Sequence, residues 1–290
     1  MRSVFFIGMM SALLLVSCES AFDMETNKES ENHSEAFTAT IENESETRTF
    51  LSNYSNNDGS HSLYWSKGDA ISISDGTGTA VFTTENDYQS KAVFTQSEGS
   101  ISHTASQYTA FYPSTITMAN MVLPAEQNYV NNNVENFPMR AVSSNKNLAF
   151  KNLCGIIRLS LKSEESGAIS VSSICLSADK GMSGAFTVDL NNAAVVSGNN
   201  GVVLNCADAQ SLYTTYSTDF NIIVPQGDYN PLKVNICDDN GNEINLVSED
   251  AISVKRSAIT RINLTLARSS FDSSLETIPI TDSNVDFTQR

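Results

Sequence analysis

Hydrophobic and polar residues alternate in short segments along most of this chain. Such segments recur about every ten residues and are separated by Gly, Asn, Asp and Ser. A period of two places apolar side chains on one face of an extended strand and polar side chains on the other. No stretch has the apolar spacing of an amphipathic helix of useful length. The pattern therefore predicts an all-β protein, with strands at residues 37–41, 70–73, 80–82, 92–94, 109–112, 169–176, 220–224, 232–236, 243–247 and 259–266.

The longest apolar run after the N-terminus, at residues 150–161, predicts a buried strand near the middle of the chain. Its β-branched residues and the turn-forming residues on both sides favour a strand over a core helix, although periodicity alone does not decide between them. We interpret it as the first strand of a second domain. The sequence thus predicts two tandem antiparallel β-sandwiches, over residues 36–147 and 148–268, followed by a tail over residues 269–290.

The first residues have the features of a bacterial export signal. Arg2 precedes an apolar segment at residues 4–16, which is too short to remain in a bilayer as a spanning helix. The sequence Leu-Val-Ser-Cys that ends at Cys18 resembles a lipobox. We therefore predict a lipoprotein signal peptide over residues 1–17 and a lipid on Cys18 that anchors the protein without spanning the membrane. An ordinary signal peptide followed by an incidental cysteine is the alternative.

Residues 18–35 are acidic and polar and offer almost nothing to bury, which predicts a tether. The whole chain has 33 acidic and 17 basic residues, and its formal net charge is −16. Nucleic acids and anionic membrane surfaces require a basic binding surface. The charge therefore argues against both as partners, so that contact with the membrane is expected through the lipid alone.

Four cysteines remain beyond Cys18, and their wide, irregular spacing is unlike that of a zinc site. Three of them lie in or at the end of apolar strands, where a free thiol behaves as a small hydrophobe. We favour mostly free thiols, while disulfide pairing stays open because four cysteines allow three full pairings. The four are Cys154, Cys175, Cys206 and Cys237.

The chain lacks a recognisable catalytic constellation. Of its three histidines, His33 lies in the acidic tether, His61 in a polar loop and His103 in a short polar segment, and none has a local partner that indicates a catalytic base held by a carboxylate. The acidic segment at residues 238–243 has the Asn-Gly of a hairpin turn. A calcium loop is the alternative there, but the segment lacks the downstream glutamate and its glycine is misplaced. We therefore predict that the protein is not an enzyme, with no catalytic residues, no cofactor and no metal site.

Several segments together resemble the fimbrillin family, the Mfa-like and FimA-like lipoprotein subunits of type V pili. They are the lipobox, the acidic tether, and a first strand that ends near Glu46-Thr47-Arg48-Thr49. The most specific segments are Trp65-Ser66-Lys67-Gly68-Asp69-Ala70-Ile71 and Phe150-Lys151-Asn152-Leu153-Cys154-Gly155. Each also has a purely structural interpretation, because Trp65 and Ile71 are expected core residues beside a Gly-Asp turn. The second segment would be a strand that enters a domain.

The resemblance implies a fold and an assembly mechanism. The fold would be two transthyretin-like β-sandwiches, and the protein would be a lipid-anchored fimbrial or adhesive subunit at the outer membrane and cell surface. An arginine-specific protease would cut after the first strand, and a strand from another fimbrial subunit would fill the groove that is left. This is donor-strand exchange, a form of β-strand addition.

The resemblance assigns roles to particular residues of this chain. Arg48 and Thr49 would flank the processed bond, and a simple strand-end arginine is the alternative. The strand that leaves would present Phe37, Ala39 and Ile41 on its apolar face. The tail would supply the donor strand or, alternatively, a last edge strand of its own domain. Its candidate donor residues are Leu275, Ile278, Ile280, Val285 and Phe287.

Two questions stay open at this level. The chain is short for a main stalk subunit, so a tip, anchor or accessory subunit or a surface lipoprotein that never polymerises is equally compatible with the sequence. The alternative function is that of a non-polymerising surface lipoprotein that binds glycans. In either case host or bacterial surface glycans or proteins are candidate partners. Aromatic side chains could stack on sugar rings, and the candidates are Tyr54, Tyr64, Tyr129, Tyr213 and Tyr216.

Overall fold

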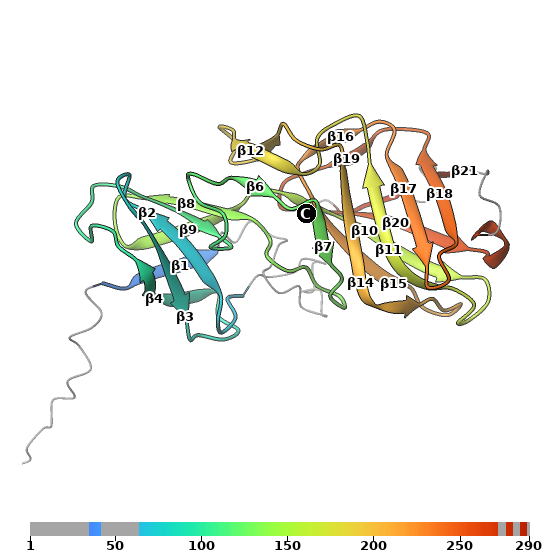
Figure 1. Cartoon of the computed structure of the whole chain (residues 1–290), viewed down its shortest axis with the longest axis horizontal. Coiled ribbons are helices and arrows are strands. Elements are labelled where there is room, and N and C mark those ends of the chain that lie inside the picture. Colours follow the sequence, from blue (N-terminus) through green and yellow to red (C-terminus); the bar gives the residue numbers. More distant parts are fainter. Residues whose placement is uncertain (1–34, 42–63, 272–276, 281–284, 289–290) are drawn as a thin grey trace, which may run out of the picture. The chain divides into compact units, whose positions relative to one another are not determined.

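The computed structural model describes residues 35–41, 64–271, 277–280 and 285–288 (Figure 1). Within these ranges the chain consists of β-strands joined by loops and turns, with one short 3-10 helix, η1 (Arg268–Phe271), and no α-helix. The prediction of an all-β protein is confirmed. No helix in the described ranges is long and apolar enough to cross a membrane.

Seven strands form a closed barrel. Apolar residues at alternate positions point into it and form a core that includes the fully buried Trp65, Phe82 and Phe150. Around the barrel the order is β1 (Phe37–Ile41), β4 (Lys91–Gly99), β3 (Thr79–Thr84), β2 (Ala70–Ser74), β5 (Tyr108–Tyr112), β8 (Met139–Ser143) and β9 (Asn147–Asn152), which pairs back with β1.

Two further sheets share one hydrophobic core. One has the order β15 (Thr218–Val224), β10 (Gly155–Ser163), β20 (Ile259–Leu266) and β22 (Val285–Thr288). The other has the order β21 (Thr277–Ile280), β18 (Glu243–Ser248), β17 (Lys233–Asp238), β11 (Ser170–Ser177), β14 (Gly201–Ser211) and β7 (Glu126–Asn128). Both sheets contribute buried residues to this core, for example Leu159 and Ile236, so the pair forms a β-sandwich.

Short strands complete the described structure. The strand β6 (Val122–Leu123) pairs with β12 (Gly184–Val188), which pairs with β13 (Ala194–Val196). The strands β16 (Gly227–Tyr229) and β19 (Ile252–Val254) form a separate pair. A third hydrophobic cluster joins residues of these strands to the long connection between β5 and β8, including Ile116, Leu123 and Phe186.

The strand pairing differs from the prediction. Where the sequence predicted a first antiparallel sandwich, a parallel pairing of β1 with β9 closes a barrel. Parallel pairs also join β10 to β20, β14 to β7 and β18 to β21. The prediction of purely antiparallel sheets is therefore wrong for these four pairs. Alternation shows which face of a strand is buried, but it does not show which distant strand lies beside it.

The apolar run at residues 150–161 forms two strands, whereas the sequence predicted one. β9 ends at Asn152 and β10 begins at Gly155, with the buried residues Leu153 and Cys154 between them. A Cβ atom at position 155 would lie 2.3 Å from the carbonyl oxygen of Lys255, so only glycine fits there. Because the link and the start of β10 are buried, the apolar pattern continues across the break and conceals it.

The Trp-x-x-Gly-Asp segment forms the predicted turn between core residues. Trp65 and Ile71 have no exposed surface, and Gly68 has a φ of 89°. The backbone N–H of Ser66 donates to the Asp69 carboxylate at 2.8 Å. The Tyr112 hydroxyl donates to the other oxygen of the same carboxylate at 3.0 Å. This part of the resemblance therefore has a structural explanation, as the sequence suggested.

The acidic segment at residues 238–243 is the hairpin turn between β17 and β18, and Gly241 adopts a φ of 80° within it. The buried carboxylate of Asp238 accepts hydrogen bonds from the backbone N–H groups of Asn240 and Asn242, at 2.9 and 2.8 Å. It also forms an ion pair with Arg268 at the start of η1. The Asp238 carboxylate thus stabilises the turn and links it to η1 through Arg268.

We expect Arg268→Ala to lower the free energy of unfolding by about 2 kcal/mol at pH 7, since it leaves a buried carboxylate without its cation. Burial raises the pKa of Asp238, but the hydrogen bonds from Asn242, Arg268 and the backbone outweigh this effect. Together they lower the pKa to about 2. Because the pKa of Asp238 is lower in the folded protein than in the unfolded chain, about 3.9, its ionised carboxylate stabilises the fold above the unfolded pKa. This stabilisation is lost as the pH falls through the folded pKa. The difference between wild type and variant should therefore shrink from pH 4 towards pH 2 in urea denaturation.

The matched control is Lys67→Ala. Lys67 forms a 2.7 Å ion pair with Glu85, but their side chains are 66% and 82% exposed. Water and salt screen such a pair, so its removal should change the free energy of unfolding little. Equal costs for Arg268→Ala and Lys67→Ala at pH 7 would contradict the structural role of Asp238.

Candidate functional site

The candidate site is the position that β1 occupies in the barrel. β1 lies between two strands, antiparallel to β4 and parallel to β9. Its backbone is bonded on both sides, as shown by the hydrogen bonds from Thr38 N to Lys146 O at 2.9 Å and from Ile41 N to Ser90 O at 3.3 Å. A strand in this position has no free edge. Its departure would leave unpaired backbone groups on both neighbours.

The three predicted residues of this strand face the barrel core. Phe37 and Ala39 have no exposed surface, and Ile41 is 6% exposed. The Phe37 ring makes edge-to-face contacts with Phe82 and Tyr108, at centroid distances of 5.1 and 4.9 Å. Such aromatic pairs stabilise a core beyond the area they bury. The structure therefore places Phe37, Ala39 and Ile41 on one apolar face, as the alternation predicted.

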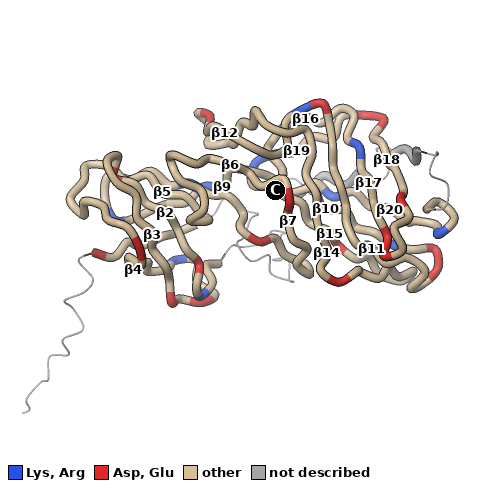
Figure 2. Tube along the Cα trace, in the orientation of Figure 1, with Lys and Arg blue, Asp and Glu red and all other residues tan. Residues whose placement is uncertain are grey.

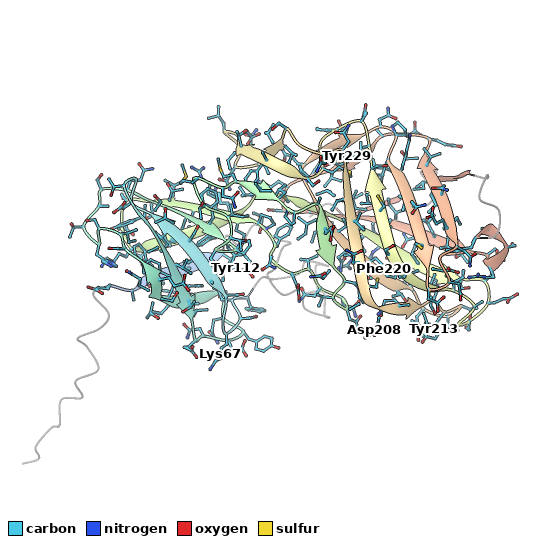
Figure 3. The ribbon with its side chains drawn as sticks, in the orientation of Figure 1. Lys67, Tyr112, Asp208, Tyr213, Phe220 and Tyr229 are labelled. Carbon is cyan, nitrogen blue, oxygen red and sulfur yellow. The ribbon has the colours of Figure 1, made fainter. Side chains whose placement is uncertain are left out.

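Trp65 contacts the middle of β1 from inside the barrel core. Its indole N–H donates to the carbonyl oxygen of Ala39 at 3.2 Å. Its ring packs against Phe94 of β4 at 5.0 Å, Phe150 of β9 at 5.3 Å and Tyr112 of β5 at 5.5 Å. Figure 3 marks Tyr112 within the barrel. The sequence identified Trp65 as a core residue but gave no sign that it binds β1.

The residues predicted for lipidation and proteolysis lie outside the described ranges. These are Cys18, Arg48 and Thr49. The chain leaves β1 at Ile41 and is described again from Tyr64. Arg48 therefore belongs to the segment that connects β1 to Trp65 along the chain, and its processing stays a prediction.

The tail contributes one strand to each sheet of the sandwich. β21 runs parallel to β18, and the buried Ile280 belongs to the sandwich core. β22 runs antiparallel to β20, with Val285 opposite Ile262 and Phe287 opposite Thr260 in the backbone register. Leu275 lies outside the described residues, and Ile278 is described by its backbone pairing with Leu246. A donor role for the tail stays a prediction.

The candidate glycan-stacking tyrosines have different environments. Tyr213 and Tyr216 stack on each other at 4.5 Å with an interplanar angle of 27°, and Tyr216 is 54% exposed. Tyr129 instead packs against Phe220 at 5.2 Å, and burial raises its pKa. Tyr64 is half-buried, and Tyr54 lies outside the described residues. Among the described candidates, the structure thus brings together one pair, the half-buried Tyr213 and the exposed Tyr216, and no row of three.

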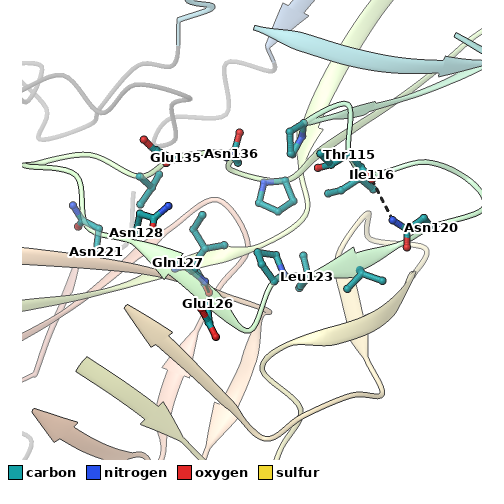
Figure 4. A pocket seen from close by; sticks show the side chains of 16 residues that line it. Thr115, Ile116, Asn120, Leu123, Glu126, Gln127, Asn128, Glu135, Asn136 and Asn221 are labelled. Atoms are coloured by element: carbon teal, nitrogen blue, oxygen red, sulfur yellow. Dashed lines mark hydrogen bonds between the residues drawn. The ribbon is translucent and has the colours of Figure 1, made fainter. Parts of the chain in front are cut away.

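The connection between β5 and β8 lines a cavity of about 400 Å³, which the sequence did not indicate (Figure 4). Gln127 forms two hydrogen bonds with the backbone of Ile223, at 2.8 and 2.9 Å. The Asn221 side chain donates to Asn133 O at 3.2 Å and accepts from Arg158 at 2.7 Å. The side-chain amides of Gln127 and Asn221 therefore hold the connection against β15 through structural hydrogen bonds. The lining combines loop residues with residues of β6, β7 and β15 that form no motif, so no sequence signal could have revealed it.

The four remaining cysteines are free thiols in the structure. Burial raises the pKa of Cys154 and Cys175, and it raises that of Cys206 to about 11. A thiol with a raised pKa is a poor nucleophile.

Among the described residues, His, Cys, Asp and Glu form no group of three that could hold a metal ion. Acidic residues are scattered over both groups of sheets (Figure 2).

No family model and no curated protein matches the chain. Among solved structures, a "putative cell adhesion protein" from Bacteroides ovatus aligns with 81% of this chain and 92% of that chain, at 12% identity and a TM-score of 0.53. The two proteins share one fold. At this identity the likeness concerns the fold alone, and at that level it confirms the resemblance that the sequence motifs indicated.

Two further structures align less well. A "putative cell adhesion protein" from Bacteroides uniformis covers 81% of this chain and 94% of its own, at 14% identity and a TM-score of 0.43. The tip fimbrial protein Mfa3 from Porphyromonas gingivalis covers 80% of this chain and 95% of its own, at 6% identity and a TM-score of 0.37. Neither score is high enough to carry an argument. These neighbours are nevertheless fimbrial and adhesion proteins by description.

Proposed function

We propose that the chain is a structural or adhesive subunit of a type V fimbria, assembled by strand exchange at the position of β1. The proposal rests on the position of β1, which is the first strand of the described residues, lies between β4 and β9, and is linked covalently to the later strands through the segment that contains Arg48. A cut in that segment makes β1 a separate peptide held by hydrogen bonds and packing alone. The shared fold and the description of the Bacteroides ovatus structure as an adhesion protein agree with this function.

The proposed sequence of events follows from the chain order. The protein is exported with a lipid on Cys18, which holds it at the outer membrane. An arginine-specific protease cuts between Arg48 and Thr49, so that β1 leaves together with the tether and the lipid. A strand from another fimbrial subunit then pairs with β4 and β9, and the chain becomes part of a fimbrium at the cell surface. We also propose that the sandwich formed by the sheets of β10 and β11 is of the transthyretin-like type.

Energetics require a replacement strand. Burial of Phe37 and Ile41 contributes about 1.5–3 kcal/mol for each side chain. Backbone groups on β4 and β9 would lose their partners as well. An empty groove is therefore unstable, and β1 should leave for good only when another strand takes its place. This is the physical basis of β-strand addition at a sheet edge.

The test is digestion of the purified exported chain with an arginine-specific protease, followed by intact mass and size-exclusion chromatography. We expect one early cut after Arg48, loss of residues 18–48 and growth of higher oligomers. Arg48→Ala should stay uncut at this position and monomeric, whereas Arg290→Ala, at the last residue, should behave as wild type. Oligomers that form equally well from the Arg48→Ala chain would contradict the proposal.

A wild-type chain that is not cut and remains monomeric would favour the alternative function, a surface lipoprotein that binds glycans. The specific observation behind it is the stacked Tyr213 and Tyr216, because Tyr216 leaves aromatic surface open to solvent. Aromatic side chains of this kind could stack on sugar rings.

A further inference from the structure

From the packing around β1 we infer that Trp65 selects the strand that enters this groove, by requiring a small residue at the position of Ala39. The partner is an extended segment of another polypeptide with an aromatic, a small and a branched aliphatic residue at successive alternate positions. This inference rests on the proposed strand exchange, and it adds the rule by which the partner is chosen.

The strand register shows where the indole ring lies. Phe94 of β4 is directly opposite Phe37, and Phe150 of β9 is directly opposite Ile41. Trp65 packs edge-to-face on both Phe94 and Phe150, at 5.0 and 5.3 Å. The indole therefore lies between the levels of Phe37 and Ile41, at the level of Ala39, whose carbonyl oxygen it binds. At this intermediate level, β1 contributes only a methyl group.

The residues beside Ala39 are buried with it, so a larger side chain at this position would have to displace them. Ala39 lies opposite Ala92 of β4 and Leu148 of β9, and all three are at most 1% exposed. The indole N–H is bonded to the Ala39 carbonyl oxygen, so the ring is held at this position. Extra methylene groups in a filled core force side chains out of their preferred rotamers and destabilise the packing. A strand with valine, leucine or phenylalanine at this position should therefore be rejected.

Positions 37 and 41, on either side, require large side chains instead. At position 37 the rings of Phe82 and Tyr108 surround an aromatic side chain. A small residue there would leave a cavity, which costs stability in proportion to its volume. At position 41 the groove holds an isoleucine that is 6% exposed. The groove thus selects the side chains at three alternate positions of the strand, and Trp65 limits the size of the middle one.

The end of the tail does not satisfy this rule. Placing Phe287 at position 37 puts either Val285 or Gln289 at position 39, depending on the strand direction. Placing Ser283 at position 39 puts Val285 or Thr281 at position 37, where an aromatic ring is required. A tail segment with the required pattern does exist further back, with Phe271, Ser273 and Leu275 at alternate positions.

The test measures peptide exchange into the full chain after the cut at Arg48, by native mass spectrometry. We expect a peptide of residues 35–42 to replace β1. The same peptide with Ala39→Leu should bind about ten- to hundredfold more weakly, since the excess volume meets the indole. A peptide of residues 281–290 should also fail, and one of residues 269–277 should bind. Ala39→Ser in the first peptide is the matched control and should bind within about tenfold of the original.

A second variant tests the role of Trp65 directly. Trp65→Phe removes part of the ring, so the cut variant should accept the Ala39→Leu peptide within about threefold of the wild-type peptide. Equal binding of both peptides to the cut wild-type chain would overturn the selection rule while leaving strand exchange intact. Failure of every peptide, including residues 35–42, would instead contradict the proposed function. These two failures are therefore distinguishable.

Discussion

Phe37→Ala should lower the free energy of unfolding of the barrel by about 3–5 kcal/mol. Phe37 has no exposed surface, and its ring lies edge-to-face against Phe82 and Tyr108. The substitution loses the burial of the ring and leaves a cavity that rigid neighbouring strands cannot fill. Urea denaturation followed by Trp65 fluorescence measures the effect, because Trp65 is the one tryptophan of the chain and lies in the same core.

Val142→Ala is the control for Phe37→Ala. Val142 belongs to β8 of the same barrel but is 46% exposed, so its truncation should change stability by about 0.5 kcal/mol or less. A cost below about 1 kcal/mol for Phe37→Ala would mean that β1 is not an integral strand of the barrel. The site would then have to be placed elsewhere.

Trp65→Ala should cost a similar amount, about 3–5 kcal/mol, and should also weaken the hold on β1. The indole contacts Phe94, Tyr112 and Phe150, and its N–H satisfies the carbonyl oxygen of Ala39. Without the ring, that carbonyl loses a partner inside a closed core. Denaturation is followed here by circular dichroism, and release of β1 after the cut at Arg48 should be faster than in wild type.

The variant Trp65→Phe separates the contribution of ring packing from that of the N–H hydrogen bond to Ala39. It keeps an aromatic ring in the core but removes the N–H donor, so it should cost less than Trp65→Ala. Tyr216→Ala serves as the control for loss of an aromatic side chain, because Tyr216 is 54% exposed in the sandwich and should contribute little. A Trp65→Ala chain as stable as wild type would contradict the packing described for β1.

Local features of the fold could be predicted from the sequence because they depend on neighbouring residues. Alternation at residues 37–41 identified both the strand and its buried face, and Asn240-Gly241 identified the hairpin turn. The Gly68-Asp69 turn between Trp65 and Ile71 was predicted for the same reason. In each case, two to six adjacent residues determine the geometry.

Features that depend on distant residues could not be predicted. The parallel pairing of β1 with β9 closes the barrel between segments that are far apart in the chain. The contact of Trp65 with Ala39 depends on that closure, and the cavity beside Gln127 depends on how loops pack. The alternating pattern is the same for a strand in a barrel and for one in a sandwich. The sequence therefore predicted β1 as an apolar strand but not the shape of the groove that holds it.

If β1 is a replaceable strand of the barrel, the fluorescence emission of Trp65 should report its departure and its replacement. The buried indole should emit at short wavelength in the intact chain, because it has no exposed surface. After digestion at Arg48, we expect a shift to longer wavelength as β1 leaves and a return as a replacement strand enters, in step with oligomer growth on a sizing column. An emission spectrum that stays unchanged while the cut is complete and oligomers form would show that β1 never leaves, and would contradict the account.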